Sequence, residues 1–170
     1  YPEHEEYLRK NNLFKGIPWG PVAIWASGVK SGELARFFVT LLEDKRPRYF
    51  VGNEKLGMAA KYLGARFIPV APADAWKDRD RVMQALATAE KNAIILYCAG
   101  MATEAFAWAA RWKRPDLSHL DMGHIFDGAA GHLSRCWLQP TGECQRRDTY
   151  FRQYAPVFRG EKDSFGEFPS

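Results

Sequence analysis

The sequence contains few cysteines, and their number and spacing exclude two ways of stabilising a small domain. Cys98, Cys136 and Cys144 are odd in number and include no Cys-x-x-Cys pair. A disulfide framework or a structural zinc site is therefore not expected, and the reducing cytoplasm is the simplest compartment for the chain.

Long hydrophobic runs and a strong charge of either sign are also missing. No apolar stretch approaches the roughly 18 to 20 residues that cross a bilayer, and no basic-then-apolar signal peptide opens the chain. We therefore expect no membrane span. The net charge of +4 suits anionic partners such as nucleotides, phosphates or nucleic acids, but it is too small to identify one of them.

What is present is enough apolar sequence for one globular domain. The 170 residues are 46% hydrophobic and 26% charged, so a core can form without disulfides or metals. The aromatic content of 14% argues against disorder. It is compatible with a site that stacks rings or sugars, although most of these side chains are expected in the core.

Short apolar runs alternate with helical patterns as far as residue 122. The apolar runs predict strands at residues 22–26, 48–51, 66–70, 93–98 and 118–122. The stretches between them predict helices at 31–44, 55–63, 74–91 and 101–112, with Ser31 as an N-cap and Gly64 as a C-cap. This alternation is typical of βαβ units. We expect a three-layer, Rossmann-like α/β fold with at least four strands in a mostly parallel sheet, strand 93–98 central and helices on both faces.

The pattern changes after residue 122. Gly123, Gly128 and Gly131 predict a mobile loop, and an Arg-rich tail from residue 139 contains one predicted helix around 144–154. We therefore divide the chain into a Rossmann-like domain over residues 1–138 and an extension over 139–170 that packs on it or trails from it.

Three segments follow predicted strands, at the edge of a parallel sheet where ligands bind. In the first two, glycine lets a ligand approach the backbone, and a helix N-terminus offers N–H groups to an anion. The alternatives are a plain turn with Asn53 as N-cap and tight helix–sheet packing at 99–103. The ligand-binding residues predicted from these segments are Gly52, Asn53, Glu54, Gly100, Met101, Thr103 and Gly123.

The third segment combines Asp121, His124 and Asp127 within seven residues. Such a cluster can bind a metal, orient a ribose or act as a base, and Arg135 can neutralise a phosphate. The alternative is that Asp121 caps the loop and His124 is a bystander on the surface. We interpret the Asp-x-Asp of residues 78–80 as the solvated face of a helix.

Four segments, taken in order, resemble glycosyltransferases of the GT-D fold from bacteria and phages. The family's patterns are VVxVGNExL, VPxxNAW, VLxSAGMA and xDxGH. The segments similar to them are Tyr49–Leu56 (YFVGNEKL), Ile68–Val70 with Ala73–Trp76 (IPV, ADAW), Ile94–Met101 (IILYCAGM) and Leu120–His124 (LDMGH). The similarity extends from about Trp19 to Arg135, about two thirds of the chain.

The resemblance implies transfer of a sugar from a nucleotide-diphosphate donor, with a divalent metal, Mn or Mg. The donor diphosphate would lie over residues 52–54 and 100–103. Asp121 and His124 would face the metal or the sugar, Asp127 would be the base and Arg135 a phosphate partner. Trp19 and Trp25 would flank the base or the acceptor. The acceptor would be a glycan or a modified DNA base, in the cytoplasm of a bacterium or a phage-infected host.

One feature of that family is missing from this sequence. Family members carry an upstream Asp-x-Glu that helps to hold metal and diphosphate, and no Asp-x-Glu occurs in the 170 residues. Together with Tyr1 as the first residue, this predicts that an N-terminal portion or a partner chain supplies the motif, or that the chain is a degenerate relative that only binds. In either case we expect the chain alone to be weakly active or inactive.

Two alternatives stand beside the glycosyltransferase. One is a non-catalytic nucleotide-binding module, which sugar-nucleotide hydrolysis would distinguish. The other is a nucleic-acid-binding interaction domain that uses the tail arginines, for which a steep salt dependence of DNA binding would be the sign. The tail arginines are Arg146, Arg147, Arg152 and Arg159.

Overall fold

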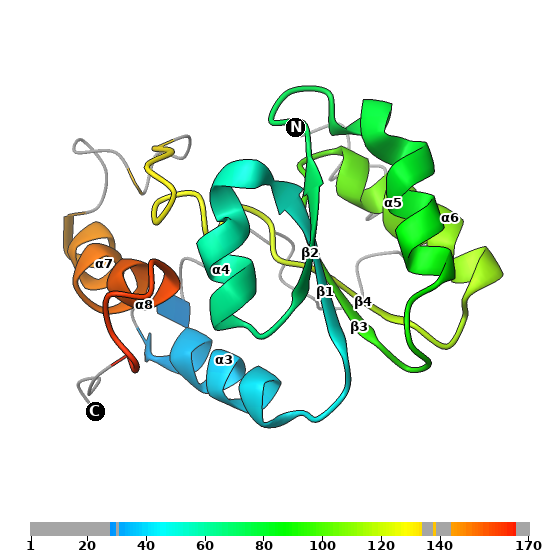
Figure 1. Cartoon of the computed structure of the whole chain (residues 1–170). Helices are drawn as coiled ribbons and strands as arrows, with labels where there is room; N and C mark the ends of the chain where they lie inside the picture. Colours follow the sequence, from blue (N-terminus) through cyan, green and yellow to red (C-terminus); the bar gives the residue numbers. More distant parts are fainter. Residues whose placement is uncertain (1–27, 30, 134–137, 139–143, 166–170) are drawn as a thin grey trace, which may run out of the picture.

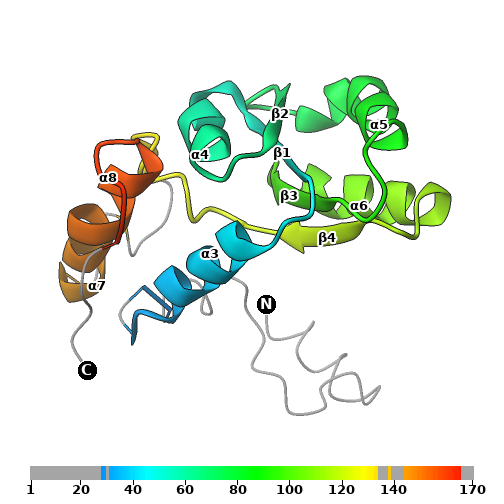
Figure 2. The same cartoon turned by 60° about the horizontal axis from the view of Figure 1, so that its bottom comes forward.

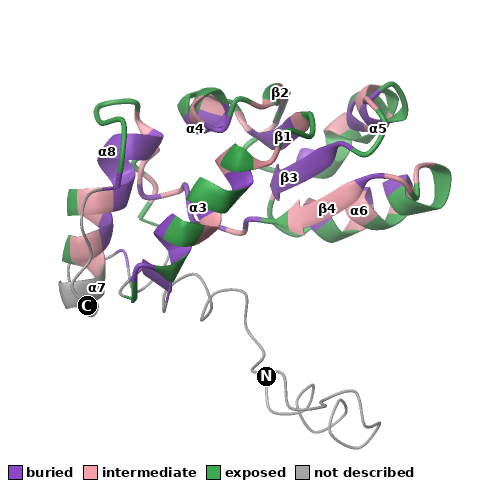
Figure 3. Cartoon of the chain, turned by 90° about the horizontal axis from the view of Figure 1, so that it is seen from below, coloured by how far each residue is buried: buried purple, intermediate pink, exposed green. Residues whose placement is uncertain are grey.

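The computed structural model describes residues 28–29, 31–133, 138 and 144–165. Its centre is an all-parallel sheet of four strands in the order β2-β1-β3-β4, which confirms the predicted α/β class (Figure 1). The strands are β1 (Arg48–Asn53), β2 (Arg66–Val70), β3 (Ile94–Cys98) and β4 (Ser118–Asp121). β3 is an inner strand of the sheet, and all five of its residues are buried (Figure 3). This agrees with its continuous apolar sequence, which is typical of a strand covered on both faces.

Helices cover both faces of the sheet, as predicted. One face packs on α5 (Arg79–Ala87) and α6 (Ala102–Lys113) through Tyr49, Val51, Ile95 and Tyr97. The other face packs on α3 (Glu33–Glu43), α4 (Gly57–Tyr62) and α8 (Ala155–Phe158) through Phe50, Ile94 and Leu96. Figure 2 shows α3, α4 and α8 on one side of the strands and α5 and α6 on the other.

Several predicted boundaries need correction. The N-cap of α3 is Gly32, with φ 75°, and Ser31 only accepts a long 3.4 Å hydrogen bond from the Glu33 N–H. β1 continues through Gly52 to Asn53, and the helix predicted at 55–63 opens with a 3-10 turn, η1 (Glu54–Leu56). The strand predicted at 22–26 lies outside the described residues.

The helix predicted at 74–91 is shorter and has two parts. It begins as a 3-10 turn, η2 (Ala75–Asp78), and α5 ends at Ala87. Beyond that point the guanidinium of Arg114 donates to the carbonyls of Leu86, Ala87 and Ala89 at 2.9–3.2 Å. These carbonyls belong to a helix end that needs donors from outside the helix.

Gly64 ends the helix as predicted, although the C-cap itself is Leu63 and Gly64 is the residue that follows it. Gly64 has φ 58°, its N–H donates to the Lys61 carbonyl, and the Ala65 N–H donates to the Ala60 carbonyl. This pair of bonds is the Schellman arrangement, which requires the left-handed conformation that glycine adopts readily.

The C-terminal segment contributes to the core. It contains α7 (Cys144–Thr149), a π-helical stretch η4 (Tyr150–Tyr154) and α8, so the predicted helix extends to Phe158. Tyr150, Tyr154 and Phe158 are buried. Two tail arginines are already engaged: Arg147 donates to the Leu138 carbonyl at 3.2 Å, and Arg159 forms an ion pair with Glu161 at 2.7 Å.

The loop after β4, predicted to be mobile, packs against the core. Ile125 and Phe126 have no exposed surface. The Tyr150 hydroxyl donates to the Ile125 carbonyl at 2.5 Å and accepts from the Ala129 N–H at 3.2 Å. At Gly128, a Cβ would lie 2.5 Å from Cε1 of Tyr150, so this glycine allows close packing on the C-terminal segment.

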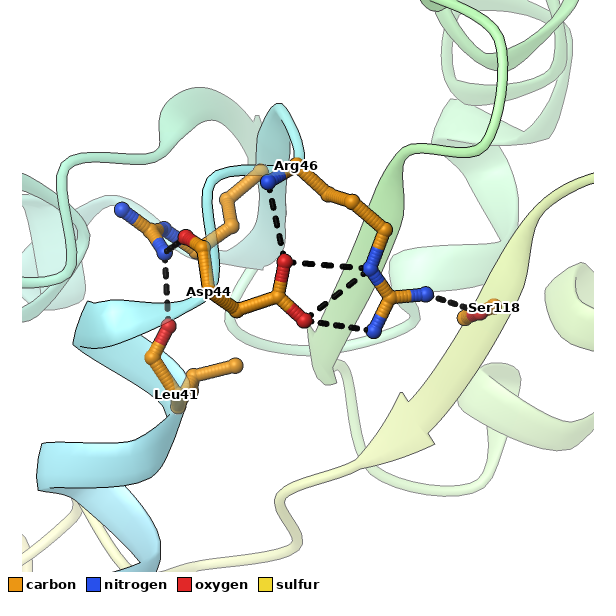
Figure 4. A network of polar contacts seen from close by, with 5 residues as sticks. Leu41, Asp44, Arg46 and Ser118 are labelled. Carbon is orange, nitrogen blue, oxygen red and sulfur yellow. Dashed lines mark hydrogen bonds and ion pairs between the residues drawn. The ribbon is translucent and has the colours of Figure 1, made fainter.

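At the amino ends of the strands, polar contacts join α3 to β1 and β4. Arg46 forms an ion pair with Asp44 at 2.7 Å and donates to the Ser118 hydroxyl at 3.0 Å (Figure 4). Arg48 donates to the carbonyls of Leu41 and Asp44, at 2.6 and 2.7 Å. The hydrogen bonds from Arg46 lower the pKa of Asp44 from 3.8 to about 2.

These contacts predict a loss of stability in acid. Because the folded-state pKa of Asp44 lies below its ordinary value, its contribution is complete above pH ~4 and is lost as the pH falls toward ~2. Hydrogen bonding to Arg114 lowers the pKa of Asp116 in the same way. In thermal unfolding between pH 7 and pH 2, we expect Asp44→Asn to lower the melting temperature at pH 7 and to flatten its fall in acid. The control Asp163→Asn should follow the parent, and a parallel curve for Asp44→Asn would contradict this account.

Candidate functional site

A cleft of about 790 Å³ lies at the carboxyl ends of the strands, where the sequence predicts a ligand site. Its walls come from four parts of the chain: the end of β1, the loop from β2 to η2, the passage from β3 into α6, and the loop after β4. Because the four strands are parallel, these segments, distant in sequence, meet at one edge of the sheet.

Most of the predicted site residues line this cleft. The predicted residues that do so are Asn53, Gly100, Met101, Asp121, Gly123, His124 and Asp127. Gly52, Glu54 and Thr103 are not among the lining residues. Arg135, Trp19 and Trp25 lie outside the described residues.

The residues that do not line the cleft have structural reasons for their positions. A Cβ on Gly52 would lie 2.7 Å from Phe50 and 3.2 Å from Leu56, so this glycine makes room for the core and not for a ligand. The Thr103 side chain is buried and accepts from the Ala99 N–H at 3.3 Å, which fixes the turn into α6.

Asn53 lines the cleft and also caps η1, since its side chain accepts from the Lys55 N–H at 3.0 Å.

The loop after β4 holds the acidic cluster through its backbone. The Asp121 carboxylate accepts from the Gly123 N–H at 2.8 Å, as the capping alternative predicts, and Gly123 has φ 55°. The Asp127 N–H donates to the His124 carbonyl at 3.0 Å, and the Asp127 carbonyl accepts from His132 at 2.8 Å. His124 is only 4% exposed, so its interpretation as a surface bystander is wrong.

Cys98, at the end of β3, is a cleft residue that the sequence did not single out as a site residue. Burial, together with the negative charges of Asp127 and Asp121, raises the pKa of its thiol. Because the thiolate is the reactive form, Cys98 is an inert wall residue at neutral pH. Asp121 and Asp127 line the same cleft.

The loop from β2 to η2 supplies two further cleft residues, Asp74 and Trp76. Asp74 is in the left-handed region, with φ 56° and ψ 55°, and its carboxylate pairs with Lys77 at 3.2 Å. Trp76 is 41% exposed and stacks on Phe106 with 5.4 Å between ring centroids. Its exposed area offers a flat apolar surface at the cleft.

Asp78 holds this loop in place. Its carboxylate accepts from the Ala71 N–H at 2.8 Å and pairs with Arg81 at 2.7 Å. The interpretation of residues 78–80 as only a solvated face is therefore wrong for Asp78. Sequence inspection missed this role because it depends on a contact seven residues away across a turn.

His119, in β4, lies apart from the cleft lining. Its Nδ1 is 2.9 Å from the Tyr97 hydroxyl, and the two rings stack. Burial and the nearby charge of Arg111 lower the pKa of His119, which keeps it neutral at pH 7. It is a histidine that packs on the sheet.

The charges around the cleft are acidic. Its lining includes four carboxylates, Asp74, Glu104, Asp121 and Asp127, and within the described part of the chain it includes no lysine or arginine. Glu104, in the first turn of α6, was also missed by sequence inspection. An anionic ligand therefore requires backbone donors or an accompanying cation.

The described residues contain no group of three or more His, Cys, Asp or Glu side chains arranged to hold a metal ion. Mg²⁺ is commonly held by one or two carboxylates together with substrate phosphates, a requirement that Asp121 and Asp127 can meet. The predicted metal-binding role of Asp121 and His124 stays a prediction.

The chain matches no protein-family model, no curated protein and no solved structure. In the described residues, no helix combines the length and the apolar character needed to cross a bilayer. The functional conclusion therefore depends on the cleft itself.

Proposed function

We propose that the cleft binds the donor of a glycosyltransferase, a nucleotide diphosphate sugar. The observation that carries this proposal is the pairing of an open helix N-terminus with carboxylates across one cleft. The first turn of α6 has no side-chain cap, and Gly100 and Met101, which precede it, line the cleft. Nothing lies within 4 Å of the position of a Gly100 Cβ, so a diphosphate can approach this backbone closely.

Other parts of the cleft lining supply what the rest of the donor needs. Asp121 and Asp127 would hold a divalent cation that accompanies the diphosphate and compensates its charge near the acidic lining. The exposed face of Trp76 would stack on the nucleobase. Asp127, whose backbone is hydrogen-bonded on both sides, is the candidate base that would take a proton from the acceptor hydroxyl as it attacks the sugar.

Binding of nucleoside diphosphates tests this proposal directly. We expect isothermal titration with UDP, GDP or ADP to show binding that tightens when Mn²⁺ or Mg²⁺ is added. Ala102→Glu would place a carboxylate at the α6 N-terminus and should weaken binding about ten-fold or more by charge repulsion. Ala87→Glu, at the exposed end of α5, is the matched control. No heat with any of these nucleotides, with or without metal, would contradict the proposal.

A non-catalytic nucleotide-binding module is the second candidate. Two observations favour it: the sequence has no Asp-x-Glu, and the described residues have no three-ligand metal group. This candidate predicts that nucleotides bind but that no sugar nucleotide is hydrolysed or transferred. Release of nucleoside diphosphate from a panel of sugar nucleotides separates the two.

A further inference from the structure

Two large tryptophans lie exposed on α6. Trp108 and Trp112 are 67% and 75% exposed, and their rings meet edge-to-face with 6.0 Å between centroids. Helix α6 already buries its other face through Phe106 and Ala110, so the tryptophans are not needed for the core. Exposed apolar patches of this kind mark interaction sites.

Two cations flank Trp112 in the sequence of α6. Arg111 and Lys113 are exposed and belong to the last turn of α6, and neither forms an ion pair with a described residue. By contrast, the tail residues Arg147 and Arg159 are already held by Leu138 and Glu161. Arg111 and Lys113 therefore add two positive charges to the end of α6 that carries the exposed tryptophans.

The spacing of Trp108 and Trp112 along α6 suits a ligand with successive planar rings. Residues four apart on a helix are separated by about 6 Å along its axis, so Trp108 and Trp112 offer two successive stacking surfaces. Glu104 lies one turn before Trp108 on the same side of the helix and belongs to the cleft. The tryptophan face is therefore continuous with the cleft.

We propose that Trp108, Trp112, Arg111 and Lys113 form a binding surface for single-stranded nucleic acid. Bases stack on the indole rings and the cations contact the phosphates, which is the combination that sequence-independent strand binding requires. A neutral glycan would stack on the tryptophans but would leave the two cations unused, so charge favours the polyanion. This surface does not depend on the donor proposal, because strand binding and nucleoside-diphosphate binding are measured separately.

Titration of the 170-residue chain with a fluorescent dodecathymidylate tests the proposal by anisotropy. We expect saturable binding that weakens about ten-fold in Trp108→Ala, and further in the Trp108→Ala/Trp112→Ala double variant. Arg111→Gln should reduce the dependence of log K on log salt by about 0.7. The matched controls are Val39→Ala and Lys61→Gln, exposed residues of α3 and α4, which should bind as the parent does.

Three outcomes would overturn the proposal. The first is unchanged binding in the double variant, with circular dichroism confirming that it is folded. The second is binding of a neutral oligosaccharide, lost in the double variant, without binding of the oligonucleotide. The third is a self-associating parent that becomes monomeric in the double variant and never binds the strand.

Discussion

Replacing Phe126 with alanine is expected to lower the free energy of unfolding by about 3–5 kcal/mol, as truncation of a buried phenylalanine usually does. Phe126 has no exposed surface, and its ring lies 4.7 Å from Phe158, 5.4 Å from Phe50 and 5.6 Å from Phe38 between centroids. It joins the loop after β4 to the sheet, α3 and the C-terminal segment. Urea unfolding followed by far-UV circular dichroism measures the change.

The matched control removes an equally large aromatic side chain from the surface. Trp108→Ala should change the free energy of unfolding by no more than about 0.5 kcal/mol, because Trp108 is 67% exposed. Phe126→Leu should cost less than Phe126→Ala, since it leaves a smaller cavity. A cost for Phe126→Ala within 1 kcal/mol of the Trp108→Ala value would show that the loop does not belong to the core.

The sheet could be predicted from the sequence because its signals are local. The continuous apolar run of β3 marks a buried strand, and the alternation of such runs with helical patterns admits few topologies. The position of the cleft followed from that topology, since ligand sites lie at the carboxyl ends of parallel strands. Asp121, His124 and Asp127 were found because they lie at the end of a strand or just after it.

The parts that could not be predicted depend on contacts between distant segments. The role of Gly52 is set by the Phe50 and Leu56 side chains, and the packed state of the 123–131 loop is set by Tyr150. A glycine in a sequence can mark a backbone that needs conformational freedom or a position where another side chain packs closely. Only the tertiary structure distinguishes the two. Glu104 was missed for a related reason. A glutamate in a helix is normally predicted to face solvent, and only the fold shows that this one lines a cleft.

The acidic lining changes how the ligand site is understood. The glycine-containing turns after β1 and β3 suggested a phosphate cradle, but the assembled cleft has four carboxylates and, in its described part, no basic side chain. A phosphate group can then bind only with its charge compensated. The proposed donor site, in which Asp121 and Asp127 hold the cation, therefore predicts metal-dependent binding. Binding that is indifferent to divalent cations would contradict that role of the two aspartates.

Asp127→Asn should separate binding from catalysis. If Asp127 is the base, the amide removes proton abstraction and lowers the turnover of a sugar nucleotide by about 10²–10⁴-fold. Because Asp127 is also a proposed cation ligand, binding of the nucleoside diphosphate should weaken as well, but by less than turnover, since Asp121 and the α6 N-terminus remain. The measurement is release of nucleoside diphosphate from a sugar-nucleotide panel in the presence of acceptor, with Asp80→Asn, on the exposed face of α5, as control. Turnover by Asp127→Asn at the parent rate would remove Asp127 from the mechanism. No turnover by the parent, despite tight nucleotide binding, would fit both a binding module and a chain whose Asp-x-Glu is supplied by another segment.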